Sequence, residues 1–256
     1  MCCIALRSVV LGGNAPTVYN AAAGLAQFWD GRAADVEAQA VGPIRNPVEM
    51  AMPSDQQVID TLASMPDYVA AFGRAFPGQP IAMARIGDAI GAFERRLVTP
   101  DRFDRFLRGD IDALTPAERT GLRTFVEVGC VTCHAGSALG ATSYRKAASL
   151  RPWPAGGGDL GRFEISRQEA DKGAFKVPTL RNIARTDPYF HDASAATLDE
   201  AVRRMAAVQH DRDLTSEQVG AIVTFLGALT GELPTDLIQK PELPKSSATT
   251  PLPDPN

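Results

Sequence analysis

Apolar residues recur at helical spacing along most of the chain. Between residues 81 and 97 they fall at i, i+4, i+7 and i+11, which predicts one helix with a single buried stripe. The members of this stripe are Ile86, Ile90, Phe93 and Leu97. Pro100 ends the pattern. Residues 14–50 are rich in Pro and Gly and are predicted to be mainly loops, with one possible helix over residues 33–40.

Helix-capping signals predict four further helices. Each begins with Ser or Thr and carries Glu or Gln three residues later, at Ser54, Thr115, Thr197 and Thr215. We expect the first helix to end at Pro66, the second to lead directly to Cys130, and the last to end at Gly231. No stretch alternates with the period of a β-strand, so the predicted fold class is all-α.

Residues 129–134 carry the clearest chemical signal of the chain. Cys130, Cys133 and His134 form the C-x-x-C-H motif, which is typical of c-type haem attachment. Two thiols bond covalently to the haem, and the histidine that follows supplies an axial nitrogen to the iron. A zinc site would need two more ligands at similar spacing, and a thioredoxin-like pair usually follows a strand. Haem attachment is therefore the preferred interpretation.

Three downstream residues could supply the second axial ligand of the iron. Met205 lies on the predicted helix between the haem motif and the last helix, and a thioether ligand suits electron transfer. His191 lies in an aromatic turn and is expected to be buried. His210 lies in a polar run and is expected to be solvated. On residue chemistry alone, two roles of Met205 are equal alternatives: a ligand of the iron and a packing residue of the core.

Composition narrows the class of protein. The net charge is −4, which gives no indication of nucleic-acid binding, and no apolar run is long enough to span a membrane. Residues 233–256 are rich in Pro, Ser and Thr and are predicted to be a disordered tail. The pair Cys2–Cys3 has neither the spacing nor the histidine of a haem motif.

Several motifs in the same order resemble the bacterial di-haem cytochrome c peroxidase family, which includes MauG-like enzymes. They are Asn14–Thr17, Phe28–Arg32, Gln39, Gly42–Pro43, Asn46–Met50, Phe93–Arg95, Arg102–Asp104, Gly129–His134, Phe175–Asn182 and Pro188–Asp192. The resemblance spans about residues 14–232. It implies a cytochrome c-like helical domain at 108–232, and a loop-rich remnant of the peroxidatic domain at 1–107.

The resemblance also implies roles for individual residues. Cys130, Cys133 and His134 would hold the electron-transfer haem, and Met205 matches its second ligand, which is Tyr in some MauG-like members. Trp29 matches the tryptophan between the two haems. The pair that lines the family's peroxide pocket corresponds to Gln39 and Glu49; a carboxylate there can move a proton between the peroxide oxygens. The calcium site of the family corresponds to Asn14, Thr186 and Pro188.

The implied function is reduction of hydrogen peroxide with electrons from a small donor protein of the cytochrome c or cupredoxin type. A periplasmic location and a homodimer are also implied. The family has two haem motifs, whereas residues 1–256 contain one, so the first is expected upstream of Asn14. The alternatives are a mono-haem electron-transfer cytochrome, or a truncated product without peroxidase activity.

Overall fold

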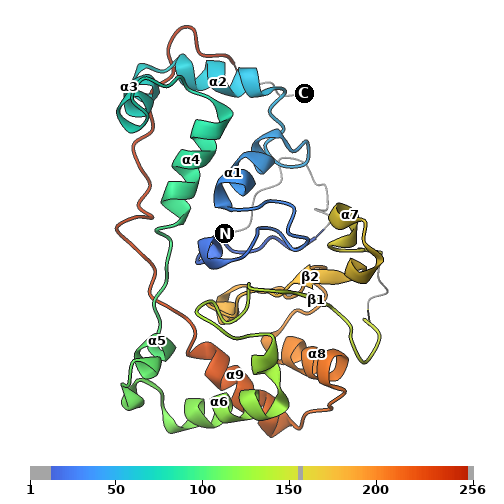
Figure 1. The fold of residues 1–256 in the computed structure, drawn as a ribbon. Helices are drawn as coiled ribbons and strands as arrows, with labels where there is room; N and C mark the ends of the chain where they lie inside the picture. The colour runs from blue at the N-terminus through green and yellow to red at the C-terminus, as the bar shows by residue number, and fades with distance from the viewer. Residues whose placement is uncertain (1–12, 155–157, 253–256) are drawn as a thin grey trace. The chain divides into compact units, whose positions relative to one another are not determined.

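The computed structural model describes residues 13–154 and 158–252, and these form two compact units (Figure 1). One unit contains Val36–Arg96 with the described residues 235–252, and the other contains residues 13–35 with Leu97–Pro234. Cys2, Cys3 and the glycines at 156 and 157 lie outside the described residues. The domain boundaries expected at residues 107 and 232 stay predictions.

Within its described residues, the first unit contains four helices. They are α1 (Val36–Arg45), α2 (Asp55–Ala63), α3 (Pro66–Ala75) and α4 (Met83–Glu94). α1 packs along α4, and Ile44, Val58 and Ile86 form the buried centre of the unit. The helices expected from Ser54 and over residues 81–97 are confirmed. Pro66 ends the first of them and also begins α3, because proline is well tolerated at the first helical position.

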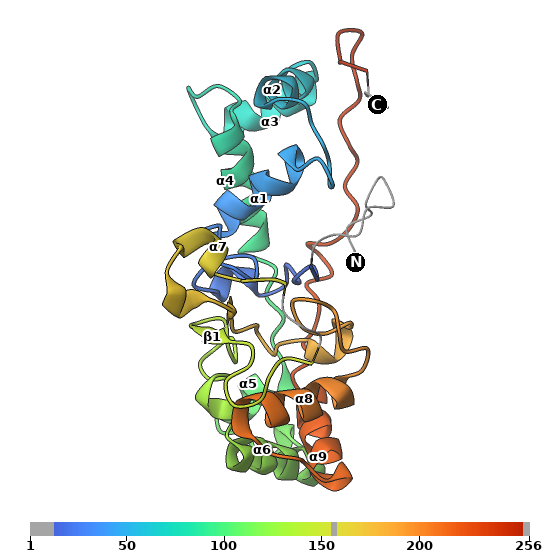
Figure 2. The same cartoon turned by 90° about the vertical axis from the view of Figure 1, so that its right-hand side faces the viewer.

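Residues 235–252, in the same unit, form no helix or strand (Figure 2). The hydroxyl oxygens of Thr250 and Ser64 lie 2.7 Å apart. The disorder expected for residues 233–256 stays a prediction.

The second unit contains five α-helices among the described residues. They are α5 (Arg102–Leu107), α6 (Pro116–Val128), α7 (Phe163–Ser166), α8 (Leu198–His210) and α9 (Ser216–Gly227). The capping signals at Thr115, Thr197 and Thr215 each begin the predicted helix. α9 ends at Gly227, one turn before the expected Gly231. α5 was not predicted, although Asp101 caps it through a reciprocal capping box.

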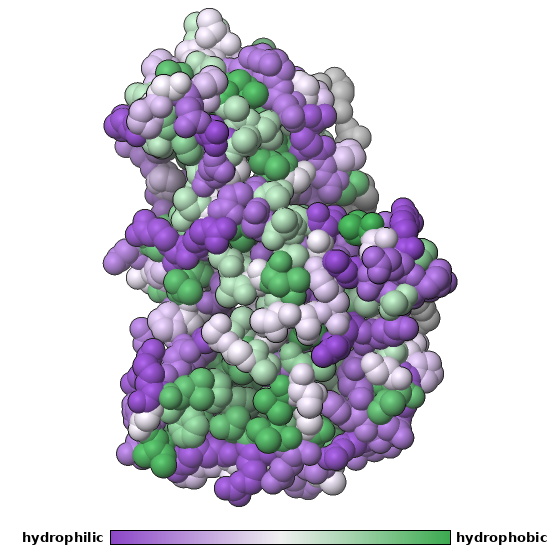
Figure 3. Space-filling view, viewed as in Figure 1, coloured by the Kyte–Doolittle hydropathy of each residue, from purple (hydrophilic) through white to green (hydrophobic). Residues whose placement is uncertain are grey.

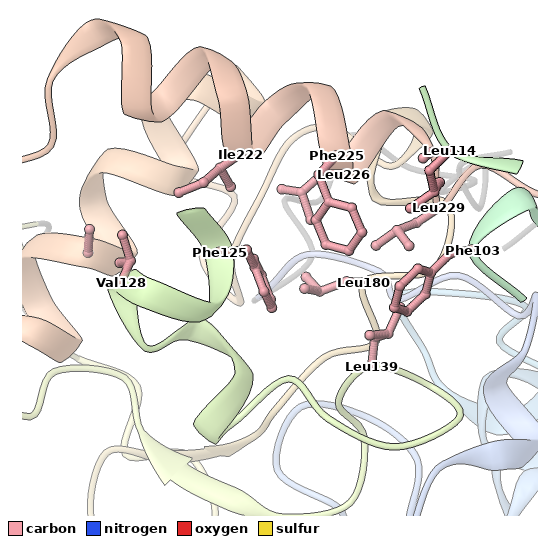
Figure 4. Close-up of a cluster of buried hydrophobic side chains, with 12 residues drawn as sticks. Phe103, Leu114, Phe125, Val128, Leu139, Leu180, Ile222, Phe225, Leu226 and Leu229 are labelled. Carbon is pink, nitrogen blue, oxygen red and sulfur yellow. The ribbon is translucent and has the colours of Figure 1, made fainter. Parts of the chain in front are cut away.

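The core of this unit lies between α6 and α9 (Figure 4). Phe125 of α6 and Phe103 of α5 both contact Phe225 of α9, with ring centroids 5.4 and 5.3 Å apart. Leu139 and Leu180, from the loops that follow the haem motif, complete the same cluster. The core therefore connects the helix before the C-x-x-C-H motif to the loops after it.

The all-α prediction misses a short β-ladder. β1 (Tyr144–Lys146) and β2 (Ala174–Lys176) are antiparallel, with Arg145 opposite Phe175. Strands of three residues are too short to show an alternating pattern, so sequence periodicity did not reveal them. The chain is helix-rich with this one ladder in its described part.

The surface adds two observations. Apolar side chains gather over the lower part of the face in Figure 3, where α5 and α6 lie. Leu107 of α5, Val126 of α6 and Ile111 between these helices are exposed apolar residues. Within the described residues, no helix combines the length and apolar character needed to cross a membrane.

The loop after the haem motif depends on a close backbone approach at Gly140. Its φ is +129°, and a Cβ added there would lie 2.2 Å from the Pro178 carbonyl oxygen and 3.2 Å from His134 Nδ1. Only glycine accommodates both the backbone conformation and the contact. Arg181 holds the same loop, because its Nε donates to the Ser137 carbonyl while its guanidinium pairs with Asp101 and Asp104.

We therefore predict that Gly140→Ala lowers the free energy of unfolding by about 3 kcal/mol, through backbone strain together with overpacking. Gly136→Ala is the matched control. Gly136 also has a positive φ, of 78°, but nothing lies within 4 Å of an added Cβ, so strain alone should cost about 1 kcal/mol. Denaturant unfolding of both variants measures the difference, and equal losses would contradict the role of the Pro178 contact.

Candidate functional site

The C-x-x-C-H turn begins where α6 ends. Gly129 adopts the left-handed conformation, with φ 103°, and closes the helix by donating from its backbone N–H to Val126. Cys130–Thr132 form one turn of 3₁₀-helix, and the His134 N–H donates to the Cys130 carbonyl at 3.0 Å. Both thiols are free and half-buried, and burial raises the pKa of Cys130 to about 11.

The imidazole of His134 is prepared for metal ligation. Nδ1 lies 3.2 Å from the Leu139 carbonyl, which can only accept, so Nδ1 carries the proton and Nε2 keeps a free lone pair. Burial lowers the pKa of His134 to about 4, despite the backbone hydrogen bonds that oppose this shift. The ring is therefore neutral at ordinary pH, which is the form that binds a metal.

The motif opens onto a pocket within the second unit that is open to solvent on one side. Cys130, Cys133 and His134 contribute one part of its wall. Aromatic and apolar side chains contribute much of the rest, namely Trp29, Trp153, Phe175, Val177, Pro178 and Phe190. Two thiols and a neutral imidazole beside an aromatic wall fit a haem. Among the described residues, no group of three or more His, Cys, Asp or Glu could hold a metal ion alone.

All three candidates for the second axial ligand line this cavity. Met205 lies on α8, half-buried, and reaches the cavity wall. His191 is buried as expected and stacks on Phe175, with ring centroids 3.9 Å apart. His210 was expected to be solvated, but it is half-buried. It occupies the last position of α8 and packs against Gly129.

Trp29 and Asn14 lie next to each other in the structure. Trp29 lines the cavity, and its Nε1 donates to the Asn14 carbonyl at 2.8 Å. The Asn14 backbone N–H donates to the His191 carbonyl at 2.7 Å, and its side-chain amide donates to the Pro188 carbonyl at 2.5 Å. The structure thus brings together Asn14 and Pro188 of the expected calcium site. Thr186 lies two residues before Pro188, and its hydroxyl donates to the Ile183 carbonyl.

Gln39 and Glu49 belong to the first unit. Gln39 lies on α1 and Glu49 in the turn that follows this helix. Oε1 of Glu49 accepts a hydrogen bond from the Asn46 side chain at 3.1 Å. Oε2 is buried and has no hydrogen-bond partner in the described part of the chain. A buried carboxylate oxygen without a partner is uncommon and indicates a functional role or an absent ligand.

Several cavity residues were missed by sequence reasoning, among them Trp153 and Lys176. Trp153 contacts His191, with ring centroids 5.4 Å apart, and its Nε1 donates to Asp192 at 2.7 Å. Lys176 is the last residue of β2 and lines the cavity beside Phe175. The available signal for Lys176 was its position within the family motif Phe175–Asn182. Trp153 lies in an irregular segment and gave none.

Comparisons with known proteins identify the family of the chain. The family model described as di-haem cytochrome c peroxidase matches residues 5–112. The cytochrome c551 peroxidase of Nitrosomonas europaea is 46% identical over 240 residues, 93% of this chain and 71% of the relative. The cytochrome c551 peroxidase of Pseudomonas aeruginosa is 43% identical, over 94% of this chain and 70% of the relative.

A solved structure of a MauG-like protein associated with microbial copper homeostasis is also similar. It superposes with a TM-score of 0.74 at 27% identity, covering 90% of this chain and 78% of that protein. The identity and coverage of the two peroxidases show the family. The chain therefore belongs to the di-haem cytochrome c peroxidase family, whose enzymes are haem-dependent oxidoreductases that act on peroxide.

Proposed function

We propose that the cavity of the second unit holds a covalent haem c, attached to Cys130 and Cys133, with His134 and Met205 as axial ligands. The observation that carries this proposal is that all four side chains line one cavity. When bound, the haem supplies reversible one-electron chemistry, and a thioether ligand raises its reduction potential. The protein would use this site to pass electrons toward the reduction of hydrogen peroxide.

The chain's own residues serve this role in different ways. The hydrogen bond from His134 Nδ1 to the Leu139 carbonyl fixes the ring. The aromatic wall offers Trp29 as a contact through which electrons would leave the cavity. Val126 and Val131, both exposed and close in sequence to Cys130, offer apolar contact to a small donor protein of the cytochrome c or cupredoxin type.

Peroxide chemistry is assigned to Gln39 and Glu49. The buried Oε2 of Glu49 is free to take a proton from one peroxide oxygen and return it to the other. Gln39 can donate and accept hydrogen bonds, which suits it to position the peroxide.

Calcium binding is assigned to Asn14, Thr186 and Pro188. The Asn14 amide already touches the Pro188 carbonyl, and turning the amide over would point a second oxygen toward the same place. A periplasmic location belongs to the same proposal, because covalent haem attachment suits an exported protein. The proposal also includes a homodimer.

The second candidate function is that of a mono-haem electron-transfer cytochrome, or a product without peroxidase activity. The observation that favours it is that the pocket and all four proposed haem residues lie within the second unit. Both candidates share the haem at Cys130 and Cys133. Peroxide turnover by the haem-loaded chain separates them.

The first prediction concerns the haem and its ligand. Co-expression with a haem-attachment system should give one covalent haem for the motif, detected by pyridine haemochrome and intact mass. Met205→Leu should keep the haem but lower its reduction potential and admit added cyanide, because leucine fills the space without a thioether. Met83→Leu, in the first unit, is the control. A potential in Met205→Leu equal to that of Met83→Leu would rule out Met205 as the ligand.

The second prediction concerns Glu49. In protein that carries both haems of the family, Glu49→Gln should lower the rate of peroxide turnover by about 10²- to 10⁴-fold, because the amide cannot transfer the proton. Asp55→Asn is the control, since Asp55 is an exposed carboxylate that pairs with Arg45 at 2.6 Å on the same unit. Steady-state kinetics with a reduced small cytochrome measures both variants. Unchanged turnover in Glu49→Gln would remove Glu49 from the mechanism.

A further inference from the structure

Lys176 places an unpaired ammonium group at the haem cavity. It is half-buried and lines the cavity. In the part of the chain that the structure describes, its side chain forms no hydrogen bond or ion pair. A charged group in such surroundings is costly unless an opposite charge compensates it.

Two carboxylates close to this end of the ladder are already engaged. Tyr144 lies directly opposite Lys176 in the β-ladder, and Asp30 and Asp171 act on it electrostatically. Asp30 pairs with Arg32 at 3.0 Å, and Asp171 pairs with Arg162 at 3.5 Å. Neither carboxylate compensates Lys176. Burial accordingly lowers the pKa of Lys176.

The backbone fixes Lys176 at this position. Its N–H donates to the Trp29 carbonyl at 2.7 Å, and the ladder pairs it with Tyr144. Two further cations, Arg145 and Lys146 of β1, line the same cavity and have no ion pair among the described side chains. The ladder therefore presents three positive charges to the cavity, of which Lys176 is the least exposed.

The chemistry of haem supplies the missing anions. Its two vinyl groups, which bond to the cysteines, lie on one edge of the porphyrin, and its two propionate carboxylates lie on the opposite edge. The cysteines come from the turn after α6, whereas the cations come from the β1–β2 ladder. The two sets of residues therefore suit the two chemically different edges of one haem.

We propose that Lys176 binds a propionate carboxylate of the haem and that its positive charge raises the reduction potential of the iron. This inference rests on the proposed function, since it requires the covalent haem. A nearby positive charge stabilises the reduced iron, which carries one positive charge less than the oxidised iron. Lys176 is thus a positioning residue for the haem and sets its potential through charge.

The test compares haem-loaded full-length variants by redox titration. Lys176→Gln removes the charge and should shift the midpoint potential downward. Lys176→Arg keeps the charge and should stay close to the wild type. Lys172→Gln is the matched control, because Lys172 is an exposed lysine four residues away that pairs with Glu169 at 3.9 Å, and it should leave the potential unchanged. Lys176→Met also removes the charge while keeping the apolar stem of the side chain. It replaces Lys176→Gln in the comparison if that variant fails to load haem.

The outcomes separate this inference from the proposed function. Wild-type protein without covalent haem would overturn the proposed function and leave no potential to compare. A haem-loaded wild type, with Lys176→Gln or Lys176→Met at the same potential as Lys172→Gln, would overturn the role of Lys176 alone. Lys176→Arg shifted as far as Lys176→Gln would also overturn it, because the charge would then not be the cause.

Discussion

The close crossing of α6 and α9 determines where the haem motif lies. At Gly121 the two helices approach so closely that an added Cβ would lie 2.0 Å from the Ala221 carbonyl oxygen. This contact allows Phe125 and Phe225 to meet in the core and fixes the direction of α6. Since Gly129 ends α6 immediately before Cys130, the same crossing fixes the starting point of the C-x-x-C-H turn. A larger residue at position 121 would move both helices and the turn together.

The far wall of the cavity is held by a different set of contacts. Residues 175–182 contribute Phe175 and Lys176 to the cavity and end at Asn182, which is buried in the core. The Asn182 amide donates to the Thr99 hydroxyl at 2.8 Å, and Asn20 donates to the same hydroxyl at 2.7 Å. Asn182 also accepts the Gly231 N–H at 2.9 Å. Buried polar groups that satisfy one another in this way specify one arrangement of the segments they join.

Local signals in the sequence predicted the helices well. The capping signals at Thr115 and Thr215 begin real helices because their reciprocal hydrogen bonds depend only on residues three apart. The β-ladder pairs residues about 30 positions apart, and nothing local specifies such a pairing. α5 was missed although Asp101 and Asp104 form a capping box, because the helix is only six residues long and has little apolar periodicity.

The residues of the candidate site also differ in how far the sequence predicts them. The spacing of Cys130, Cys133 and His134 is chemical and could be recognised directly. The meeting of Met205, Trp29 and His191 at one cavity depends on how α8 and the loops fold back. The family resemblance gave roles to Met205 and Trp29, whereas His191 was expected only to be buried. The prediction that His210 is solvated was wrong. Its polar sequence neighbourhood does not show that the last residue of a helix can pack against Gly129. Lys176 was missed because a single lysine carries no pattern.

The buried carboxylate oxygens without a hydrogen-bond partner lie in a different unit from the cavity at the C-x-x-C-H motif, within the described residues. Within the described residues, the buried side-chain oxygens without a partner are Oε2 of Glu49 and Oε2 of Glu94, and both belong to the first unit. Burial, with the nearby charge of Glu37, raises the pKa of Glu94, so this carboxyl retains its proton more readily than an exposed one. The haem cavity of the second unit is lined instead by thiols, imidazoles, aromatic rings and cations. Glu49, to which we assign proton transfer with a peroxide, thus lies in one unit, and the side chains that we propose to hold the haem lie in the other.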